Sequence, residues 1–320
     1  MTIARKTVLL VGATGATGNA ILKELVASPL YDVIALIRKE SVNKPRAKAI
    51  QASIRVGDAS DPIDTLVKNL EGVDILISAI APNQLLTQVN LATAAKKAGV
   101  GRMVPCSFST VCPVGNVVEL RDQKEVVHQH MYKLHLPYTI IDNGFWYQAS
   151  FPQLPSGKLE YAMIDENLEV FGDGNTRDCM TDLADIARYT VKIIGDERTL
   201  NKKVFCYGTV ATQNEVMSIM EKVSGEKVNV QKVDPAAHLK AIDEAERKYR
   251  AHPEDEMNLW MLIGPQYNSN RFIRADNTPE NAWYSGYLDA RQLYPDFRPR
   301  TFEEFATTLV AGKEKNPYMD

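Results

Sequence analysis

The first half of the chain alternates short apolar runs with longer amphipathic segments. Such runs predict strands that are buried on both faces of a sheet. They occupy residues 8–11, 33–37, 54–56, 73–78, 102–104 and 138–141. The segments between them, at residues 15–27, 61–69, 84–98 and 119–135, have the lengths of helices. Leu85, Val89 and Ala92 illustrate the helical spacing of their apolar side chains. This alternation predicts a doubly wound α/β fold, with helices on both faces of a parallel sheet.

The rhythm changes after Phe145. Proline and glycine cluster between residues 152 and 174, and an aromatic-rich stretch runs from residue 260 to 287. Helices are expected at residues 182–194, 213–224, 234–253 and 302–310, and a strand near 204–207. Thr301 can cap the last helix, because Glu304 stands at the capping-box position three residues later. The sequence therefore predicts a second, smaller and mostly helical C-terminal part.

Composition narrows the class of protein. The chain has 320 residues, of which 45% are hydrophobic, and a net charge of −3. The hydrophobic fraction excludes a disordered protein. The slightly negative net charge gives no basic surface that would attract nucleic acid or an anionic membrane. The four cysteines are scattered and form no Cys-x-x-Cys pair, so we expect free thiols and no metal site. No apolar stretch approaches the ~20 residues that span a bilayer, and we expect a soluble, cytoplasmic protein.

A glycine-rich turn follows the first predicted strand and opens the first predicted helix. Its glycines are Gly12, Gly15 and Gly18. In this context Gly12 allows the tight turn, Gly15 lets the backbone approach a pyrophosphate, and Gly18 permits close packing of helix on strand. The amino end of the helix then offers free N–H groups to the phosphates. The turn predicts a Rossmann-type dinucleotide site.

The end of the second predicted strand indicates which dinucleotide binds. An NAD site has an Asp or Glu there for the ribose 2′-hydroxyl, whereas this chain has Arg38 and Lys39. Arg38 can hold a 2′-phosphate through paired hydrogen bonds, and Lys39 adds a second positive charge. Glu40, the next residue, could instead reach the ribose. We expect NADP(H) as the cofactor.

Several further motifs, spread over almost the whole chain, resemble one family. They are Ala35-Leu-Ile-Arg38, Asp74-Ile-Leu-Ile-Ser78, Ala94-Ala-Lys-Lys-Ala-Gly-Val-Gly-Arg-Met-Val-Pro105, Leu136-Pro-Tyr-Thr139, Phe171-Gly-Asp-Gly-Asn175, Asp185-Ile-Ala, Gly286-Tyr-Leu-Asp, Leu293-Tyr-Pro-Asp-Phe297 and Thr301-Phe-Glu-Glu-Phe305. With the glycine turn, they resemble the NmrA-like and isoflavone-reductase-like branch of the atypical short-chain dehydrogenases, which includes phenylcoumaran benzylic ether and pinoresinol reductases. The resemblance implies an NADPH-dependent reductase of secondary metabolism, or an NADP-binding regulator that has lost catalysis.

The resemblance assigns the catalytic role to Lys124. The family's catalytic lysine stands on a helix twelve residues ahead of a Leu/Ile-Pro-Tyr-Thr segment, which begins here at Leu136. The tyrosine of ordinary short-chain dehydrogenases is replaced by Leu120, which has no proton to donate. Lys124 could act as general acid or base beside the nicotinamide, or could hydrogen-bond its ribose. His128 lies four residues later on the same helix face, and we interpret it as a surface histidine.

One segment departs from the family pattern. Plant reductases read Val-Pro-Ser-Glu-Phe-Gly where this chain has Cys106, Ser107, Phe108 and Ser109 after Val-Pro. A glutamate and a glycine are lost and two hydroxyl groups are gained. Ser107 or Ser109 could orient a substrate carbonyl or merely cap the loop, and the sequence favours neither reading. The departure leaves the identity of the substrate open.

Aromatic residues after the sixth predicted strand form a candidate wall for the substrate. Phe145, Trp146 and Tyr147 follow this strand at the edge where ligands of open α/β sheets bind. Residues with a weaker claim, for which core packing is the favoured alternative, are Met163, Met180, Trp260, Met261 and Tyr267.

The two predicted sites comprise the following residues. The predicted cofactor contacts are Gly12, Thr14, Gly15, Ala16, Thr17, Gly18, Arg38, Lys39, Asp58, Ser78, Ala79, Ile80, Phe108, Lys124, Asn143 and Phe145. The predicted substrate contacts are Ser107, Ser109, Phe145, Trp146, Tyr147, Met180, Trp260 and Tyr267. Residues 1–150 are expected to bind NADP, with residues near 176–212 packed on them. Residues 151–175 and 213–320 are expected to bind the substrate.

The function expected first is an NADPH-dependent reductase of a small aromatic or polyketide-like metabolite, acting as a monomer or homodimer. An NADP-sensing regulator without turnover and a non-redox isomerase, dehydratase or cyclase are the alternatives. Motifs for other chemistries are missing from the sequence: it has no Gly-x-Ser-x-Gly elbow, no Walker lysine and no His-Glu-x-x-His pair.

Overall fold

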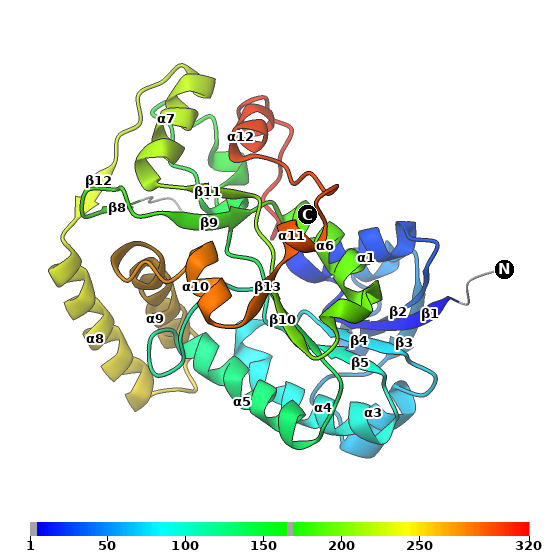
Figure 1. Ribbon diagram of the computed structural model, residues 1–320. Coiled ribbons are helices and arrows are strands. Elements are labelled where there is room, and N and C mark those ends of the chain that lie inside the picture. Colours follow the sequence, from blue (N-terminus) through cyan, green and yellow to red (C-terminus); the bar gives the residue numbers. More distant parts are fainter. Residues whose placement is uncertain (1–4, 165–168, 320) are drawn as a thin grey trace. The chain divides into compact units, whose positions relative to one another are not determined.

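The computed structural model describes residues 5–164 and 169–319, and the chain folds into two compact units (Figure 1). The first unit comprises the residues up to Phe108, together with Asp122–Asp142 and Ile186–Val204. The second comprises Ser109–Arg121, Asn143–Asp185 and Phe205–Asp320. Each unit is therefore built from separate stretches of chain. The division of the chain into an NADP-binding part and a substrate-binding part stays a prediction.

A parallel five-stranded sheet forms the centre of the first unit. Its strand order is β3-β2-β1-β4-β5, so the chain winds outward from β1 in both directions. The strands are β1 (Lys6–Val11), β2 (Tyr31–Ile37), β3 (Ser53–Val56), β4 (Ile75–Ser78) and β5 (Arg102–Val104). In the register, Leu9 of β1 lies beside Ile34 on one side and Leu76 on the other. The predicted doubly wound α/β fold is confirmed.

Helices cover both faces of this sheet. Figure 1 shows α1 and α6 on one side and α3, α4 and α5 on the other. The helices are α1 (Ala16–Ala27), α2 (Pro45–Lys48), α3 (Ile63–Asn69), α4 (Gln88–Lys97), α5 (Glu119–Lys133) and α6 (Leu183–Gly195). Short 3₁₀ turns span Lys39–Ser41, Pro82–Thr87 and Glu197–Thr199. The helix expected from residue 84 therefore begins only at Gln88, after one of these turns.

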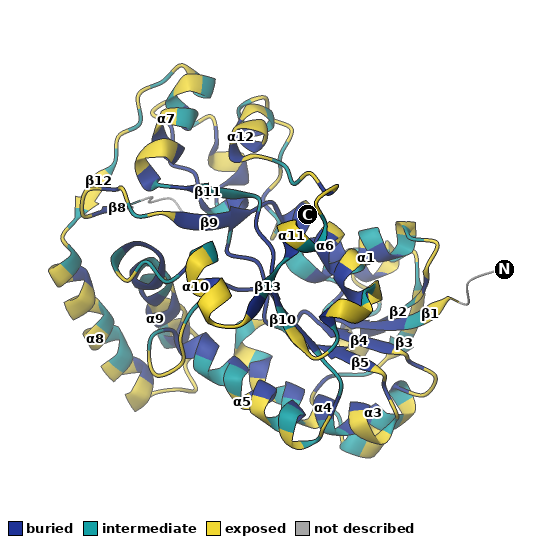
Figure 2. Ribbon diagram, viewed as in Figure 1, coloured by how far each residue is buried: buried dark blue, intermediate teal, exposed yellow. Residues whose placement is uncertain are grey.

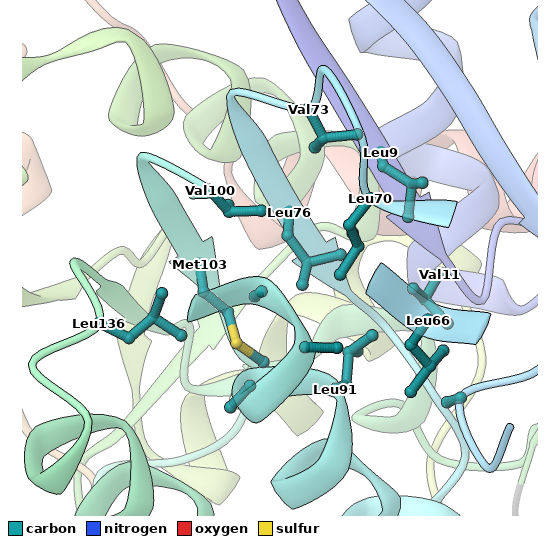
Figure 3. Packing of buried hydrophobic residues seen from close by; sticks show 14 of the residues in the cluster. Leu9, Val11, Leu66, Leu70, Val73, Leu76, Leu91, Val100, Met103 and Leu136 are labelled. Atoms are coloured by element: carbon teal, nitrogen blue, oxygen red, sulfur yellow. The ribbon is translucent and has the colours of Figure 1, made fainter. Parts of the chain in front are cut away.

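The core of the first unit lies between the sheet and the helices α3 and α4 (Figure 3). Leu9, Leu76 and Met103 project from the strands and meet Leu66 of α3 and Leu91 of α4. All five are fully buried. Truncating a buried leucine of this kind to alanine costs about 2–5 kcal/mol, so this layer fixes the strand ends that carry the loops described below.

The edge strand β3 is less buried than its apolar residues predict. Ile54 and Val56 are 40% and 53% exposed. The reason is their place at the edge of the sheet, because within the described part of the chain β3 has a neighbouring strand only on the β2 side. The expectation of burial on both faces is wrong for this strand.

Two further strands extend the first unit. β6 (Thr139–Asp142) follows a parallel bridge between Met103 and Tyr138, so it lies beside β5. β10 (Lys202–Phe205) is the neighbour of β6. The side chain of Thr139 donates to the carbonyl of Thr199 at 2.9 Å, which ties β6 to the segment after α6.

The second unit combines small sheets with helices. Its strands are β7 (Phe145–Trp146), β8 (Glu169–Phe171), β9 (Asp178–Thr181), β11 (Thr209–Ala211), β12 (Gln231–Val233) and β13 (Tyr287–Asp289). Its helices are α7 (Gln213–Ser224), α8 (Pro235–Ala251), α9 (Glu256–Asn268), α10 (Pro279–Tyr284), α11 (Ala290–Leu293) and α12 (Phe302–Val310). Single turns lie at Tyr147–Ala149 and Glu160–Ala162, and a π-helix at Ser269–Ile273 follows α9. The expected helical character of the C-terminal part is confirmed.

Local sequence signals explain where α7, α8 and α12 form. Thr301 accepts from the backbone N–H of Glu304, whose carboxylate in turn accepts from the backbone N–H of Thr301, and Thr212 and Glu215 form the same capping box on α7. α8 is largely exposed, as its charged residues predict (Figure 2). Among the described helices, none combines the length and apolar character needed to cross a membrane.

Candidate functional site

A cavity of about 190 Å³ opens in the first unit where β1, β2, β3 and β4 end. The predicted cofactor contacts that line it are Gly12, Thr14, Gly15, Arg38, Asp58, Ala79 and Ile80. Other lining residues that sequence reasoning missed include Ser41, Gly57 and Gln84. Because the carboxyl ends of parallel strands share one edge of a sheet, the loops after them meet around the same space.

The three glycines of the turn have different structural reasons. Gly12 has a φ of +84°, and a Cβ there would lie 2.2 Å from the carbonyl oxygen of Ala79. A Cβ on Gly18 would lie 2.0 Å from the carbonyl oxygen of Gly12. At Gly15, the N-cap of α1, the nearest atom would be 3.4 Å away. Gly12 and Gly18 are therefore required by packing, whereas Gly15 leaves space beside the amino end of α1, where an anionic group is favoured.

Arg38 lines the cavity from the end of β2 and is half-exposed. Its Nε lies 3.3 Å from a carboxylate oxygen of Glu40 and 3.9 Å from one of Asp58. Glu40 therefore pairs with the arginine beside it. The cation stays at the cavity edge, where it can meet a phosphate.

The second cation near the cavity differs from the predicted one. Lys39 is exposed and is not part of the lining, so its predicted contact finds no support in this geometry. Arg46 of α2 instead donates from Nη1 to the carbonyl of Thr14 at 3.2 Å, which brings a guanidinium to the glycine turn. No local feature of the sequence indicates this contact, because Arg46 and Thr14 are 32 residues apart.

Some predicted contacts sit behind the cavity surface. Ala16, Thr17 and Gly18 belong to the first turns of α1 and do not line the cavity. Ser78 is fully buried, and within residues 5–164 and 169–319 its hydroxyl oxygen has no hydrogen-bond partner. None of these four residues lines the cavity, so their predicted cofactor contacts find no support in this geometry.

Lys124 of α5 is a buried lysine, only 6% exposed. Its Nζ donates to the carbonyl of Ser107, three residues past β5, at 2.6 Å. The neighbouring thiol of Cys106 contacts the carbonyl of Ile80, a residue of the cavity lining, at 3.4 Å. The lysine is thus anchored on a loop that adjoins the cavity. Leu120, one turn earlier on α5, is also buried.

The interpretation of His128 as a surface histidine is wrong. The residue is 1% exposed, its Nε2 lies 3.0 Å from the hydroxyl of Ser107, and its Nδ1 lies 3.2 Å from a carboxylate oxygen of Glu125. The hydrogen bonds from His128 and then from Gln129 lower the pKa of Glu125 to about 2, against the opposing effect of partial burial. The spacing of four residues from Lys124 was the signal, but burial of that helix face became visible only in the fold.

Three predicted substrate contacts come together in the second unit. The hydroxyl groups of Ser109 and Tyr267 are 3.0 Å apart. The ring of Phe145 lies 6.1 Å from that of Tyr267, centroid to centroid. Phe145 and Tyr267 are both partly exposed. They present an apolar face with a pair of hydroxyl groups beside it, which suits an aromatic ligand that carries an oxygen.

Arg271 packs against the Phe145 ring of this group, and no sequence pattern predicted it. Its guanidinium carbon is 3.6 Å from the centroid of the Phe145 ring. Asp178 accepts from Nε and Nη2 of Arg271 at 2.9 and 2.8 Å and also from Asn277 at 2.6 Å. Arg271 and Asp178 are almost completely buried. The ion pair therefore fixes the guanidinium against one face of the Phe145 ring.

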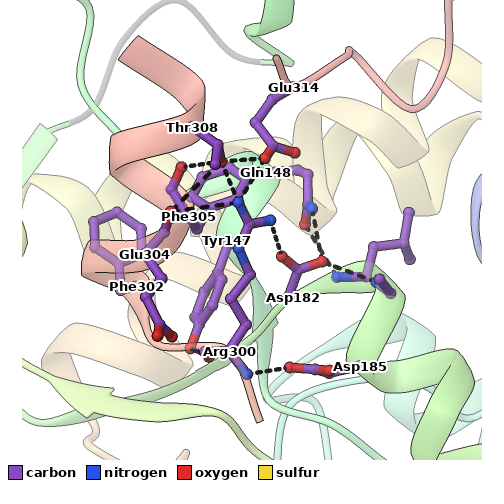
Figure 4. Close-up of polar contacts among 12 residues, drawn as sticks. Tyr147, Gln148, Asp182, Asp185, Arg300, Phe302, Glu304, Phe305, Thr308 and Glu314 are labelled. Carbon is purple, nitrogen blue, oxygen red and sulfur yellow. Dashed lines mark hydrogen bonds and ion pairs between the residues drawn. The ribbon is translucent and has the colours of Figure 1, made fainter. Parts of the chain in front are cut away.

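Other predicted substrate contacts lie elsewhere in the second unit. Tyr147 is fully buried, and its hydroxyl contacts Thr209 and donates to the carbonyl of Arg300, in the polar network of Figure 4. In that network the guanidinium of Arg300 contacts Asp182 at 2.7 Å and Glu314 at 2.7 Å. Tyr147 is therefore a core residue, and so is Met180, which is 1% exposed. Neither side chain is open to a ligand in this structure, so the predicted substrate contacts of Tyr147 and Met180 find no support in this geometry.

The remaining candidates also divide between buried and exposed positions. Asn143 is fully buried, and its backbone N–H donates to the carbonyl of Ser109. The rings of Trp146 and Tyr318 stack, with their centroids 6.2 Å apart. Trp260 on α9 is 50% exposed, so the core packing favoured for it is wrong. The same holds for Met261, whereas Met163 is buried as favoured.

The model of the NmrA-like family matches residues 4–306. This chain belongs to the NmrA-like family. The resemblance drawn from the glycine turn and the downstream motifs is therefore confirmed.

Two relatives show how far the similarity extends. The NmrA-like chain is 35% identical over 312 residues to the asnovolin J 5′,6′-dehydrogenase nvfM of Aspergillus novofumigatus, covering 95% of each protein. It is 29% identical over 320 residues to an isoflavone reductase-like protein of Olea europaea, covering 95% of this chain and 98% of the relative. Among solved structures, the binary complex of leucoanthocyanidin reductase with NADPH from Vitis vinifera has a TM-score of 0.80 at 23% identity, covering 95% of this chain and 99% of that one. That structure supports the fold.

Proposed function

We propose that this chain is an NADPH-dependent oxidoreductase of the isoflavone reductase-like type, which reduces a small aromatic or polyketide-like metabolite. The observation that carries the proposal is the buried Lys124. Its ammonium group uses one donor on the Ser107 carbonyl, on a loop that adjoins the cavity lined by the glycine turn and Arg38. A lysine ammonium has three donors, and among the described residues it makes this one hydrogen bond, so two donors remain for a ligand. The relatives named above include a dehydrogenase and a reductase-like protein.

The cavity fits the phosphates of NADPH. Gly15 leaves room at the amino end of α1, and Arg38 supplies the cation for a 2′-phosphate. When bound, NADPH supplies the hydride that a reduction needs. The pairing of Arg38 with Glu40 and Asp58 holds the guanidinium in place through exposed contacts that a phosphate can replace.

The side chains supply the proton and the orientation of the substrate. Reduction of a ketone, an enone or a quinone methide adds a proton in addition to the hydride, and Nζ of Lys124 assists its transfer directly or through a water molecule. With Leu120 at the tyrosine position, Lys124 takes the role of proton donor. Within the second unit, Ser109 and Tyr267 offer hydroxyl groups and Phe145 offers a ring to a ligand that carries an oxygen.

The test compares Lys124→Ala with Lys133→Ala, an exposed lysine at the end of the same helix. NADPH consumption is followed by the nicotinamide absorbance at ~340 nm, with a panel of aromatic ketones and enones as substrates. We expect turnover of Lys124→Ala to fall ~10²-fold or more, while NADPH affinity stays within about tenfold. Lys133→Ala should match the wild type. Unchanged turnover in Lys124→Ala would remove this lysine from the mechanism.

The cofactor is tested separately by the fluorescence of bound NADPH and NADH. The 2′-phosphate is the only difference between the two, so Arg38→Ala should weaken NADPH binding about tenfold or more and leave NADH binding nearly unchanged. A clear preference of the wild type for NADH would contradict the assignment of NADPH.

An NADP-sensing regulator is the second candidate, and one observation favours it. The hydroxyl of Ser107, which could have met a substrate, is instead engaged by His128 inside the protein. A regulator would bind NADPH with the same Arg38 dependence and consume none with any member of the panel. A product formed without loss of NADPH would indicate a non-redox isomerase, dehydratase or cyclase.

A further inference from the structure

Ser107 is held at two atoms by one face of α5. Its backbone carbonyl accepts from Nζ of Lys124 at 2.6 Å, and its side-chain hydroxyl meets Nε2 of His128 at 3.0 Å. Lys124 and His128 are four residues apart, so they lie one above the other on the helix. Ser107 and His128 are each 1% exposed. Solvent therefore does not compete for these contacts, which strengthens them.

The proton on Nδ1 of His128 follows from its other neighbour. Glu125 lies one turn earlier, and its carboxylate is 3.2 Å from Nδ1. A carboxylate accepts hydrogen bonds only, so Nδ1 carries a proton. Nε2 and the Ser107 hydroxyl share the second hydrogen bond, in which either group can be the donor. Glu125, His128 and Ser107 form a chain of hydrogen bonds that ends on the residue to which Lys124 is anchored.

The backbone after Ser107 needs such support. Phe108 has a φ of +35°, which is unfavourable for a residue with a bulky side chain. The carbonyl of Ser107 belongs to the peptide between these two residues, so its direction depends on this unusual φ together with the ψ of Ser107. Phe108 is held by its N–H on the carbonyl of Ile141 at 2.8 Å, and Ser107 by its N–H on that of Pro105 at 2.8 Å. The side chain of Ser107 supplies the remaining contact, through His128.

We propose that His128 and Glu125 are positioning residues for Lys124, which fix Ser107 so that its carbonyl holds the ammonium group in one place. The proposal rests on the proposed function, in which Lys124 assists proton transfer. It assigns a role to a histidine that does not itself face the cavity lining. Loss of the chain from Glu125 to Ser107 releases the Ser107–Phe108 peptide from its unfavourable conformation and leaves the Lys124 ammonium without a fixed acceptor.

The kinetic test uses His128→Leu, which removes both hydrogen bonds, and His128→Gln, whose amide can still reach Ser107. Ser107→Ala removes the hydroxyl with a smaller change and serves if His128→Leu folds poorly. The control is His130→Leu, because His130 stands on the same helix and also bonds a hydroxyl, that of Thr93 at 2.8 Å. We expect kcat of His128→Leu and Ser107→Ala to fall about tenfold or more, with KM and NADPH affinity within about threefold. His128→Gln should recover most of kcat, and His130→Leu should keep it.

A second measurement does not depend on turnover. Acetylation of Lys124 by an N-hydroxysuccinimide ester, quantified by mass spectrometry, reports how firmly the ammonium group is held. We expect labelling of Lys124 to be several-fold faster in His128→Leu and Ser107→Ala than in the wild type, and unchanged in His130→Leu.

The outcomes separate this inference from the proposed function. Equal labelling of Lys124 in all variants would overturn the positioning role, and so would an equal loss of kcat in His130→Leu and His128→Leu. If the wild type consumes no NADPH with any substrate, the proposed reductase fails, and the labelling contrast decides the positioning role alone.

Discussion

At the scale of single residues, the glycine turn separates two requirements that look alike in the sequence. A Cβ on Gly18 would meet the backbone of Gly12 at 2.0 Å, whereas a Cβ on Gly15 would meet nothing closer than 3.4 Å. Gly18→Ala should therefore lower the melting temperature clearly, because backbone atoms must shift. Gly15→Ala should keep the melting temperature of the wild type but weaken NADPH binding about tenfold or more, because the methyl group occupies the place of a phosphate. Thermal unfolding and NADPH fluorescence measure the two effects, and wild-type affinity in Gly15→Ala would contradict the placement of the phosphates.

Glu125 gives a prediction for pH. Its pKa is lowered from 4.5 to about 2, chiefly by the hydrogen bond from His128. A lowered pKa means that folding favours the ionised form, so the stabilisation is complete above about pH 4.5 and is lost as the pH falls through about 2. The free energy of unfolding of the wild type should exceed that of Glu125→Gln near neutral pH, and the gap should narrow as urea titrations are carried from about pH 6 to about pH 3. If the difference in unfolding free energy between the two proteins does not change with pH, the hydrogen bond from His128 does not stabilise the ionised form of Glu125.

At the scale of secondary structure, a buried ion pair joins β9 to the π-helix after α9. Asp178 and Arg271 are 1% and 3% exposed in their side chains. Asp178→Ala leaves the Arg271 guanidinium buried without its counter-charge, which should cost about 3–5 kcal/mol. The control is Arg177→Ala, which breaks the exposed pair of Arg177 with Glu280 and should change the stability by no more than about 1 kcal/mol. Urea unfolding measures both, and equal costs would contradict the role of burial.

The elements that the sequence predicted best are those with local signals at both ends. α12 spans Phe302–Val310 as expected, because Thr301 and Glu304 form a capping box and the apolar residues Phe302, Phe305 and Leu309 are buried on one face. The helix after β4 begins later than its apolar pattern suggests, since a 3₁₀ turn at Pro82–Thr87 intervenes. Apolar spacing alone does not distinguish these two kinds of helical turn.

At the scale of the whole molecule, cofactor binding should stabilise the fold. A ligand that binds only the folded state adds about 2.7 kcal/mol when its concentration is about one hundred times its dissociation constant. NADPH should therefore raise the melting temperature of the wild type, and it should do so less in Arg38→Ala at the same concentration. NADH should give the smaller shift in the wild type, and the shifts from the two cofactors should differ less in Arg38→Ala. Equal shifts from the two cofactors in the wild type would contradict a role for Arg38 in binding a 2′-phosphate.

The sequence by itself determined the sheet, the glycine turn, the family and the position of Lys124. These depend on short-range patterns, because apolar runs, helix caps and a glycine triad act within a few residues of one another. The tertiary structure alone decided that His128 is buried against Ser107, that Arg46 reaches the glycine turn, and that Tyr147 belongs to the core. Each of these facts depends on which segment packs against a given side chain, and a histidine, arginine or tyrosine carries no local sign of the neighbour it will meet. Long-range packing therefore settled how the candidate lysine is held, after the sequence had placed it.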